Sequence, residues 1–429
     1  MNIVYDKGNV TIYYIPTSKF KNNVLDIYFC DKLDKNTAYM NALIPRILER
    51  GSVKFPTMRN KSRFLKKMYG TAFSTGADTA GEIHLTNFVL DYVDSRYIRS
   101  EDGDSDFESV LFDFVIDQIT NPVTQDYDGI TGFNEEYFYQ EVQRQNEQIA
   151  NIINDKQSYA YNCLIESMCA DESYSVYYLG SIEDSKDLTP QKLYEYYKNH
   201  YLKNYSVKIF YSSSSSPDKL IEAISKSDVF TGEKVKASTV GYKEVHECEA
   251  KEVIKAMDVT QGKLVMGYRT NVAPDSDDYY ALMVTNGIFG SGTQSKLFRN
   301  VREKNSLAYY AYSSTRRCKG LMIVSSGIDI SKKDAAAEVI GIQLEDIKAG
   351  KISDEEMKAA KNGLRNALNS QYDTQYSLID FYLAQSFFDK KILEPDEYKE
   401  RIEKVTKEDC AKIANRIKLD TVFFLTAKE

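Results

Sequence analysis

Arg302 and Tyr309 are the two residues whose types and spacing most directly suggest a chemical role. They belong to the stretch LFRNVREKNSLAY, residues 297–309, with Arg302 near its middle and Tyr309 at its end. The pattern predicts an amphipathic helix, a turn and then an apolar strand, so the two side chains flank the turn. Both can donate hydrogen bonds to a polar ligand. Taken alone, they are more simply interpreted as a surface arginine paired with Glu303 and a strand tyrosine in a chain with 33 tyrosines.

Histidine and cysteine spacing offers no local metal motif. The three histidines are far apart, whereas local zinc motifs place two of them one helical turn apart (His84, His200, His246). Each is expected to make an ordinary hydrogen bond at a strand or helix end. The cysteines form no CxxC pair and are interpreted as reduced, mostly buried thiols: Cys30, Cys163, Cys169, Cys248, Cys318 and Cys410. No Cys–His or Ser–His arrangement stands out for nucleophilic catalysis.

The composition is that of an ordinary globular protein. The chain has 429 residues, enough for two or three domains, and 28% of them are charged and 42% hydrophobic. A net charge of -8 without a dense lysine or arginine cluster argues against a nucleic-acid partner. The charged, alternating N-terminus is unlike a secretory signal, and no apolar run reaches the roughly 18 residues of a membrane span. We therefore expect a cytoplasmic protein.

Hydrophobic periodicity and helix caps predict a similar series of elements in each half. In the first half, the expected strands are Val10–Ile15, Val24–Cys30, Gly81–Asp91 and Ser206–Tyr211, and the expected helices are 37–49, 107–119, 134–154 and 188–202. In the second half, the expected strands are Gly262–Tyr268, Gly320–Ile328 and an apolar strand at the end of the chain. The expected helices there are 278–289, 333–349 and one that Ser353 and Glu356 cap.

Three pairs of segments indicate that one half repeats the other. SRFLKKMYGTAFSTGAD parallels SKLFRNVREKNSLAYYAYSS, LTPQKLYEYY parallels VTKEDCAKIA, and the long capped helices at 134 and 353 stand at matching points. A repeat of roughly 200 residues indicates duplication of one α+β domain. We predict an N-terminal domain at 1–230, a polar linker at 231–245 and a C-terminal domain at 246–429.

Together with LFRNVREKNSLAY, this repeat resembles the insulinase (pitrilysin) family of zinc peptidases, which includes the mitochondrial processing peptidase subunits and small bacterial members. The resemblance spans essentially the whole chain. It implies two homologous domains, each an antiparallel sheet packed with helices on one face. In dimers of the family, four such domains enclose a chamber that holds an extended peptide.

The zinc motif that the resemblance implies is absent. Active members carry H-x-x-E-H on the first long helix, where the histidines bind zinc and the glutamate activates a water. The matching helix, TAYMNALIPRILERGS, places Ala42 and Arg46 at the histidine positions and Pro45 at the glutamate position. Alanine cannot ligate, proline cannot act as a base, and arginine brings a fixed positive charge. Residues 1–83 contain no histidine, so a shift of register does not restore the motif.

The family's third zinc ligand falls in EVQRQNEQIANIINDK, residues 141–156. The aligned residue is Gln148, with Glu147 as the alternative one position away, and Glu141 matches a further family carboxylate. A remaining carboxylate cannot form a zinc site without the other ligands. We therefore expect no bound metal or other cofactor and no autonomous peptidase activity.

Arg302 and Tyr309 match the family signature residue for residue. The resemblance implies that the arginine helps to hold the substrate backbone and that the tyrosine hydroxyl donates to the carbonyl oxygen as it gains charge. The leading hypothesis is a non-catalytic subunit that binds peptide and pairs with a zinc-bearing homologue, or with a second copy of itself. The alternative is a structural or peptide-binding scaffold without a role in proteolysis.

Overall fold

The chain folds into two compact units. The computed structural model describes residues 1–98, 106–230, 239–245, 249–388 and 390–428. The first unit consists of Met1–Ala150 and Val176–Thr239, and the second of Asn151–Ser175 and Val240–Glu429. A segment from the first half of the sequence therefore belongs to the second unit. A division of the chain at one point between its halves does not predict this. The predicted linker at 231–245 stays a prediction, because residues 231–238 lie outside the described residues.

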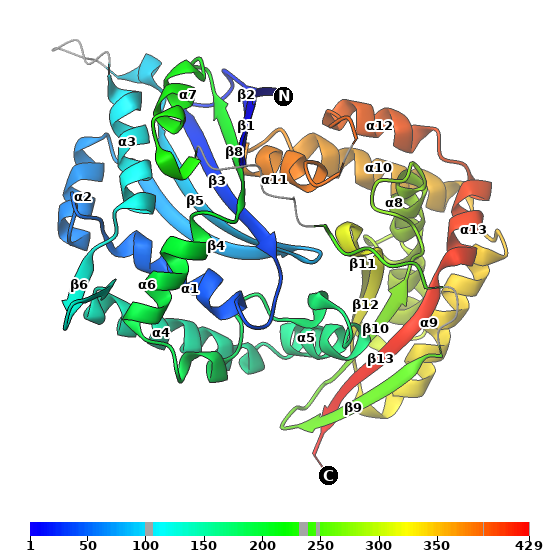
Figure 1. The fold of residues 1–429 in the computed structure, drawn as a ribbon. Coiled ribbons are helices and arrows are strands. Elements are labelled where there is room, and N and C mark those ends of the chain that lie inside the picture. Colours follow the sequence, from blue (N-terminus) through cyan, green and yellow to red (C-terminus); the bar gives the residue numbers. More distant parts are fainter. Residues whose placement is uncertain (99–105, 231–238, 246–248, 389, 429) are drawn as a thin grey trace. The chain divides into compact units, whose positions relative to one another are not determined.

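The first unit is built on a six-stranded sheet with the order β1-β2-β8-β3-β5-β4 (Figure 1). Its strands are β1 (Asn2–Lys7), β2 (Val10–Pro16), β3 (Asn22–Lys32), β4 (Ala72–Ala80), β5 (Ile83–Val93) and β8 (Ser206–Ser213). Neighbouring strands are antiparallel apart from the parallel pair β2 and β8. A separate hairpin joins β6 (Thr124–Tyr127) and β7 (Ile130–Phe133).

The helices of the first unit enclose an aromatic-rich core with this sheet. They are α1 (Ala38–Arg50), α2 (Met58–Lys67), α3 (Phe107–Thr120), α4 (Glu135–Asn151), α6 (Pro190–Tyr196) and α7 (Asp218–Ser225). Shorter helical segments are η1 (Ser95–Tyr97), η4 (Ile182–Ser185), η5 (Tyr197–Tyr201) and η6 (Asp228–Phe230). The core joins buried residues of β2, β3, β5 and β8 to residues of α1, α3 and α6. These helices are thus fixed on the sheet by apolar burial.

The second unit repeats the sheet of the first. Its strand order is β11-β12-β10-β13-β9, and neighbours are antiparallel apart from β9 and β13. The strands are β9 (Lys251–Met257), β10 (Gly262–Arg269), β11 (Ala308–Arg316), β12 (Leu321–Ile328) and β13 (Lys418–Ala427). The order β2-β8-β3-β5-β4 matches β9-β13-β10-β12-β11, so β1 is an additional outer strand of the first unit. The predicted duplication of one α+β domain is confirmed.

The helices of the second unit pack mainly on one face of its sheet. They are α5 (Lys156–Met168), α8 (Asp278–Phe289), α9 (Lys333–Lys348), α10 (Asp354–Ser370), α11 (Gln375–Gln385), α12 (Pro395–Glu403) and α13 (Lys407–Arg416). Shorter segments are η2 (Ile152–Asn154), η3 (Ser173–Ser175), η7 (Phe298–Lys304), η8 (Arg317–Lys319) and η9 (Ile330–Lys332). The main core joins α8, α9 and α13 to alternate residues of β10 and β12.

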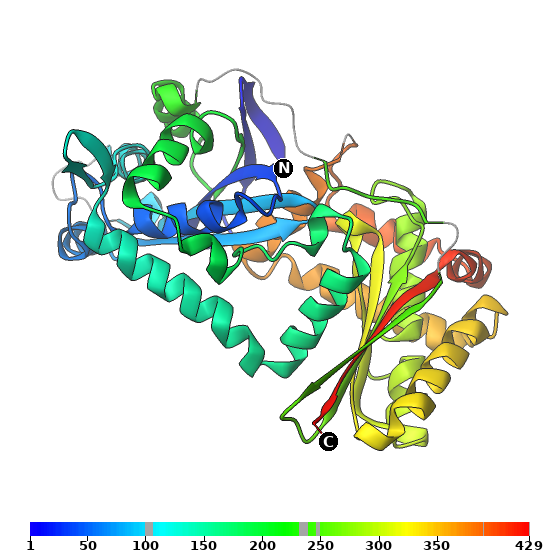
Figure 2. The ribbon, with the colours of Figure 1, turned by 60° about the horizontal axis from the view of Figure 1, so that its bottom comes forward.

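Helix α5 covers the opposite face of the second sheet (Figure 2). Leu264 and Met266 of β10 face the main core, whereas Val265 between them packs with α5. Successive residues of a strand point to opposite faces, so β10 is buried on both sides. Strand β10 and helix α5 pack closely at Gly267, because a Cβ on this residue would meet the Met168 sulfur at 2.5 Å. The expectation of helices on one face only is therefore incomplete for this unit.

Most predicted elements and caps are confirmed. The Asn134 side chain accepts from the Tyr137 amide at 3.1 Å, and Ser353 and Glu356 form the predicted capping box of α10. The predicted amphipathic helix before Tyr309 is instead π-helical in η7. Strand β1 and helices α11 and α12 were not among the predicted elements. No helix within the described ranges combines the length and hydropathy that a membrane crossing requires.

A buried cluster of charges holds the inserted segment in the second unit. Arg269 Nη2 lies 2.7 Å from Glu172 Oε1, and Arg269 Nε lies 2.9 Å from Asp420 Oδ2. Lys319 Nζ lies 2.5 Å from the other Glu172 oxygen. Burial by itself raises the pKa of Glu172, but hydrogen bonds from Arg269 and Lys319 outweigh it and lower that pKa. Glu172 thus stays ionised between two buried cations.

Replacing Glu172 with glutamine should destabilise the second unit strongly. The change keeps the shape but leaves two buried cations facing one carboxylate, and breaking a buried ion pair in this way costs about 3–5 kcal/mol. Urea unfolding followed by circular dichroism measures the loss. Glu166→Gln on the exposed side of α5 is the matched control, with an expected change below about 0.5 kcal/mol. Equal stability of the two variants would contradict the role of the cluster.

The histidines make the ordinary hydrogen bonds predicted for them where the structure describes them. His84 Nδ1 lies 3.4 Å from Asn41 Nδ2, and His200 Nε2 lies 3.2 Å from Asp31 Oδ2. His246 lies outside the described residues. His84 is only 1% exposed, and this burial lowers its pKa to about 4. The imidazole is therefore neutral in the folded protein near pH 7.

We expect the free energy of unfolding to fall as the pH drops from about 6.5 toward 4. In this window the unfolded chain binds a proton at His84, whereas the folded chain keeps the imidazole neutral. The contribution of neutral His84 to the free energy of unfolding is therefore complete above pH 6.5. It is lost on acidification, at up to about 1.4 kcal/mol per pH unit. Urea unfolding at a series of pH values should show a smaller slope for His84→Gln. Identical slopes for this variant and the unchanged protein would refute the assignment.

Candidate functional site

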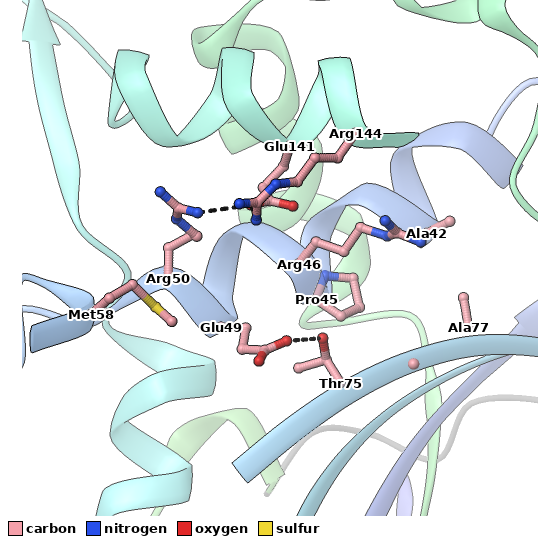
Figure 3. A pocket seen from close by; sticks show the side chains of 11 residues that line it. Ala42, Pro45, Arg46, Glu49, Arg50, Met58, Thr75, Ala77, Glu141 and Arg144 are labelled. Atoms are coloured by element: carbon pink, nitrogen blue, oxygen red, sulfur yellow. Dashed lines mark hydrogen bonds and ion pairs between the residues drawn. The ribbon is translucent and has the colours of Figure 1, made fainter. Parts of the chain in front are cut away.

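The predicted zinc-motif positions line a cavity in the first unit. Helices α1 and α4 and strand β4 surround about 330 Å³ of space, and Figure 3 shows the lining side chains. The lining includes Ala42, Pro45, Arg46, Glu49, Arg50, Met58, Thr75, Gly76, Ala77, Glu141 and Arg144. The structure thus brings together the α1 positions and the Glu141 position that the sequence alignment placed nearly 100 residues apart. Gln148 is not itself part of the lining.

Helix α1 presents non-ligating residues where the motif would stand. Its apolar residues, among them Leu43, Ile44 and Ile47, are buried in the core and fix the helix against the sheet. Ala42 is buried and offers no donor atom, and Pro45 lies inside the helix with neither a titratable group nor a backbone N–H. The cavity wall formed by these two residues is therefore apolar and chemically inert.

Arg46 and Gln148 hydrogen-bond to each other across the two helices. Arg46 Nη2 donates to Gln148 Oε1 at 2.5 Å. The alternative ligand position, Glu147, instead accepts from Gln143 on its own helix at 2.8 Å. The contact places Gln148 beside Arg46, and the choice between Gln148 and Glu147 as the aligned ligand position stays a prediction.

Glu141 is occupied by two guanidinium groups. The side chain is almost fully buried, and one of its oxygens lies 3.2 Å from Arg50 Nη1 and 2.7 Å from Arg144 Nη1. Arg50 also donates to Gln140, and its guanidinium lies 5.0 Å from the centre of the Tyr137 ring. A carboxylate that accepts two charge-assisted hydrogen bonds is held in place by them. Glu141 therefore joins α4 to α1 as an ion-pair partner.

The residues present do not fit zinc. A zinc site needs about four ligands from histidine, cysteinate or carboxylate side chains. Alanine and proline supply none, glutamine supplies a neutral amide, and the permanent charge of Arg46 repels a cation. Within the described parts of the chain, no group of three or more histidine, cysteine or acidic side chains is arranged to hold a metal ion.

Arg302 and Tyr309 lie on either side of a turn in the second unit. The π-helical segment η7 ends at Lys304, and Ser306 has the left-handed φ of 49°. The Leu307 amide donates to the Val301 carbonyl at 2.9 Å, which closes the turn before β11 begins. The predicted helix–turn–strand order is confirmed, with a π-helix in place of the expected α-helix.

Tyr309 is displayed by a bulge at a sheet edge. Among the strands that the structure describes, β11 pairs with β12 alone, and Ala308 faces Ile328 while Tyr310 faces the next residue, Gly327. Tyr309 is the extra residue between them and is 64% exposed. Bulges reorient side chains at strand edges and are common beside functional sites. The Tyr309 hydroxyl makes no hydrogen bond within the described part of the chain.

Arg302 has partners of its own. Its guanidinium lies 4.7 Å from the centre of the Phe298 ring, and Nε lies 3.6 Å from Glu303 Oε1. The side chain is still 44% exposed. The simpler interpretation of the sequence, a surface arginine paired with Glu303, predicted this pair. Such exposed pairs contribute little to stability, so the arginine can change partners at small cost.

Arg50 and Arg144, which line the cavity together with Arg46, were not among the predicted site residues. Arg50 follows Arg46 by one helical turn and Arg144 follows Glu141 by three residues, so each pair shares a helix face. That spacing could have indicated an arginine-rich site. The pairing of Glu49 with Thr75 of β4 at 2.8 Å, drawn in Figure 3, could not have been found in this way.

The cysteines give no support to a thiol-based site. Burial raises the pKa of Cys30 and Cys169 to about 12 and that of Cys318 and Cys410 to about 11. Thiols of this kind remain protonated near pH 7 and are poor nucleophiles. The described cysteines are free thiols, and Cys248 lies outside the described residues.

Comparisons with known proteins establish the family. Residues 187–364 match the model described as "Peptidase M16 inactive domain". The chain is 32% identical over 426 residues to the "Probable inactive metalloprotease YmfF" of Bacillus subtilis, which covers 98% of this chain and 97% of that protein. The chain therefore belongs to the M16 (insulinase) peptidase family, among its inactive members.

Further relatives agree with this assignment. The crystal structure of a conserved protein from Enterococcus faecalis V583 superposes with a TM-score of 0.90 at 27% identity and covers 98% of this chain and 97% of that chain. The mitochondrial-processing peptidase subunit alpha-2 of Dictyostelium discoideum is 23% identical over 165 residues, which are 36% of this chain and 37% of that protein. The predicted two-domain insulinase-type fold is confirmed.

Rebuilding the zinc ligands tests the alignment. We expect Ala42→His, Pro45→Glu, Arg46→His and Gln148→Glu together to give a protein that retains about one zinc per chain after dialysis, measured by mass spectrometry of the metal. The three α1 changes without Gln148→Glu form the control, because they would suffice only if Glu147 were the third ligand. A folded fourfold variant without zinc, with folding checked by circular dichroism, would show that the alignment is wrong.

Proposed function

We propose that the chain is the non-catalytic subunit of a two-chain zinc metalloendopeptidase. It would bind peptide and pair with a zinc-bearing M16 homologue, which supplies the metal and the general base. The observation that carries the proposal is an asymmetry between the units. The first unit has arginine, proline and alanine where the metal site should be, whereas the second unit still displays Arg302 and Tyr309.

The display of Tyr309 supports a role outside its own chain. The Tyr309 phenol is mostly exposed on a bulged edge strand, and its hydroxyl can donate to an oxygen of a bound ligand. Donors aimed at an oxygen that gains negative charge stabilise the transition state of peptide hydrolysis. Arg302, which is half-exposed beside the same turn, can hold the peptide backbone or a carbonyl.

Two edge strands offer places for an extended peptide. β4 ends the sheet of the first unit beside the cavity, and β11 ends the sheet of the second unit at Tyr309. The outer backbone groups of an edge strand can pair with an added strand, which is a common way of binding peptides. This arrangement supports peptide binding without a metal in this chain.

The comparisons support pairing with another chain. The D. discoideum relative is named as a subunit of a processing peptidase, and the B. subtilis relative is named as an inactive metalloprotease. A division of labour between an inactive and an active chain fits both names. We propose a cytoplasmic location, a zinc-bearing homologue or a second copy of this chain as partner, and no nucleic-acid partner.

Reconstitution with a zinc-bearing M16 homologue from the same host tests the proposal. We expect Tyr309→Phe to lower kcat of the pair roughly 100-fold, as loss of one oxyanion donor does in other enzymes, and Arg302→Ala to lower kcat/KM at least about tenfold. Arg299→Ala in η7 and Tyr312→Phe in β11 are matched controls with expected activity near that of the unchanged pair. Unchanged activity in both test variants would contradict the proposed clamp.

A scaffold without a proteolytic role is the second candidate. The contacts of Arg302 with Glu303 and Phe298 favour it, because they show that the arginine is already engaged in the free chain. Affinity capture of the tagged chain from its native host separates the two candidates. Recovery of a homologue with an intact H-x-x-E-H motif supports the peptidase subunit, whereas its absence supports the scaffold.

A further inference from the structure

The cavity at the lost zinc site has more positive than negative charge. Three guanidinium groups line it, those of Arg46, Arg50 and Arg144, and they face two carboxylates, Glu49 and Glu141. The excess is one positive charge. The apolar wall of Ala42 and Pro45 excludes water on one side, and charges interact more strongly in such surroundings than in bulk water.

Both carboxylates of the cavity are already engaged. Glu141 accepts from Arg50 and Arg144, and Glu49 accepts from the Thr75 hydroxyl at 2.8 Å. Figure 3 shows Glu49 turned toward β4 and Glu141 turned toward the guanidinium groups above α1. Neither carboxylate forms an ion pair with Arg46.

Arg46 has N–H donors that can bind a further ligand. Of its five N–H donors, one bonds to the neutral amide of Gln148, and no ion pair to Arg46 forms within the described part of the chain. Arg144 makes one hydrogen bond to Glu141, and its side chain is 59% exposed. Both can therefore bind an incoming anion, whereas the two terminal nitrogens of Arg50 already donate to Glu141 and Gln140 and its guanidinium lies over the Tyr137 ring.

The cavity opens beside the free edge of β4. Thr75, Gly76 and Ala77 belong both to this strand and to the cavity lining. Within the described ranges β4 pairs with no strand other than β5, so its outer edge can pair with an extended peptide. Because side chains of a strand alternate between two faces, a peptide added here would point some of its side chains at the arginines.

We propose that this cavity is a carboxylate-binding site that selects acidic peptides. An acidic side chain or a C-terminal carboxylate would be held by Arg46 and Arg144, since a guanidinium binds a carboxylate through two parallel hydrogen bonds. One carboxylate balances the single excess charge. The proposal rests on the proposed peptide binding and adds the class of peptide. A position that binds zinc in active relatives would thus bind an anion here.

Fluorescence anisotropy with three labelled decapeptide pools tests the site. All three pools have degenerate neutral residues at the other positions. The first has one central glutamate and an amidated C-terminus, and the second has glutamine in place of the glutamate and the same amidated C-terminus. The third has the glutamine and a free C-terminal carboxylate. We expect the full-length protein to bind the first or the third pool about tenfold more tightly than the second. The better of the two identifies the source of the carboxylate.

Two variants locate the site. Arg46→Gln and, independently, Arg144→Gln should reduce the preference for the carboxylate to about twofold or less while the affinity for the glutamine amide pool stays the same. Arg63→Gln on the exposed face of α2, which is outside the cavity lining, is the charge-matched control and should keep the full preference.

The outcomes separate this proposal from the proposed function. Equal binding of all three pools, or a preference that survives both arginine variants, overturns the carboxylate site but leaves peptide binding intact. Absence of binding to every pool overturns peptide binding, and the carboxylate site with it. A preference that both cavity variants remove and Arg63→Gln retains supports both.

Discussion

Hydrogen bonds between side chains of α1 and α4 are the interactions on which the candidate site depends. Arg50 with Glu141 and Arg46 with Gln148 join the two helices beside the positions that the sequence aligns with the family's zinc motif. A metal ion fixes its ligands by coordination, and here guanidinium groups connect the same helices without one. Because Glu141 is almost fully buried, loss of both arginine partners would leave its charge buried alone.

This connection extends along the helix pair. Near the start of α1, the Tyr39 hydroxyl donates to Asn146 at 2.9 Å, and Gln145 donates to the Tyr39 carbonyl at 3.0 Å. The polar contacts thus run from the first to the last turn of α1, while its opposite face is buried in the core. The helix pair can therefore stay assembled after the metal ligands have been replaced.

The duplication allowed the two units to diverge. Both keep the same order of five strands with one parallel pair, and each buries a core of its own against its sheet. The additions differ: β1 extends one sheet, and α5 covers the second face of the other. The second addition depends on Glu172, which pairs with Arg269 and Lys319 in the interior. One scaffold thus carries an arginine-lined cavity in one unit and an exposed tyrosine in the other.

Much of the fold could be predicted because its signals are local. Caps such as Ser353 with Glu356 act within four residues, and the apolar periodicity of α8 and α9 acts within a few turns. The π-helical form of η7 could not be predicted, because its seven residues are too few for the apolar pattern to distinguish an α-helix from a π-helix. The place of α5 could not be predicted either, since its burial depends on strands from the second half of the chain, far from it in sequence.

The sequence by itself determined that the zinc ligands are missing. Ligation is a property of single side chains, and Ala42, Pro45 and Arg46 lack it in any fold. It also determined the family, through a repeat and a motif that can be read along the chain. Only the tertiary structure decided what replaced the ligands. Arg46, Arg50 and Arg144 surround one cavity because burial of their helices brings α1 and α4 together, and contacts between distant segments have no local signature in the sequence.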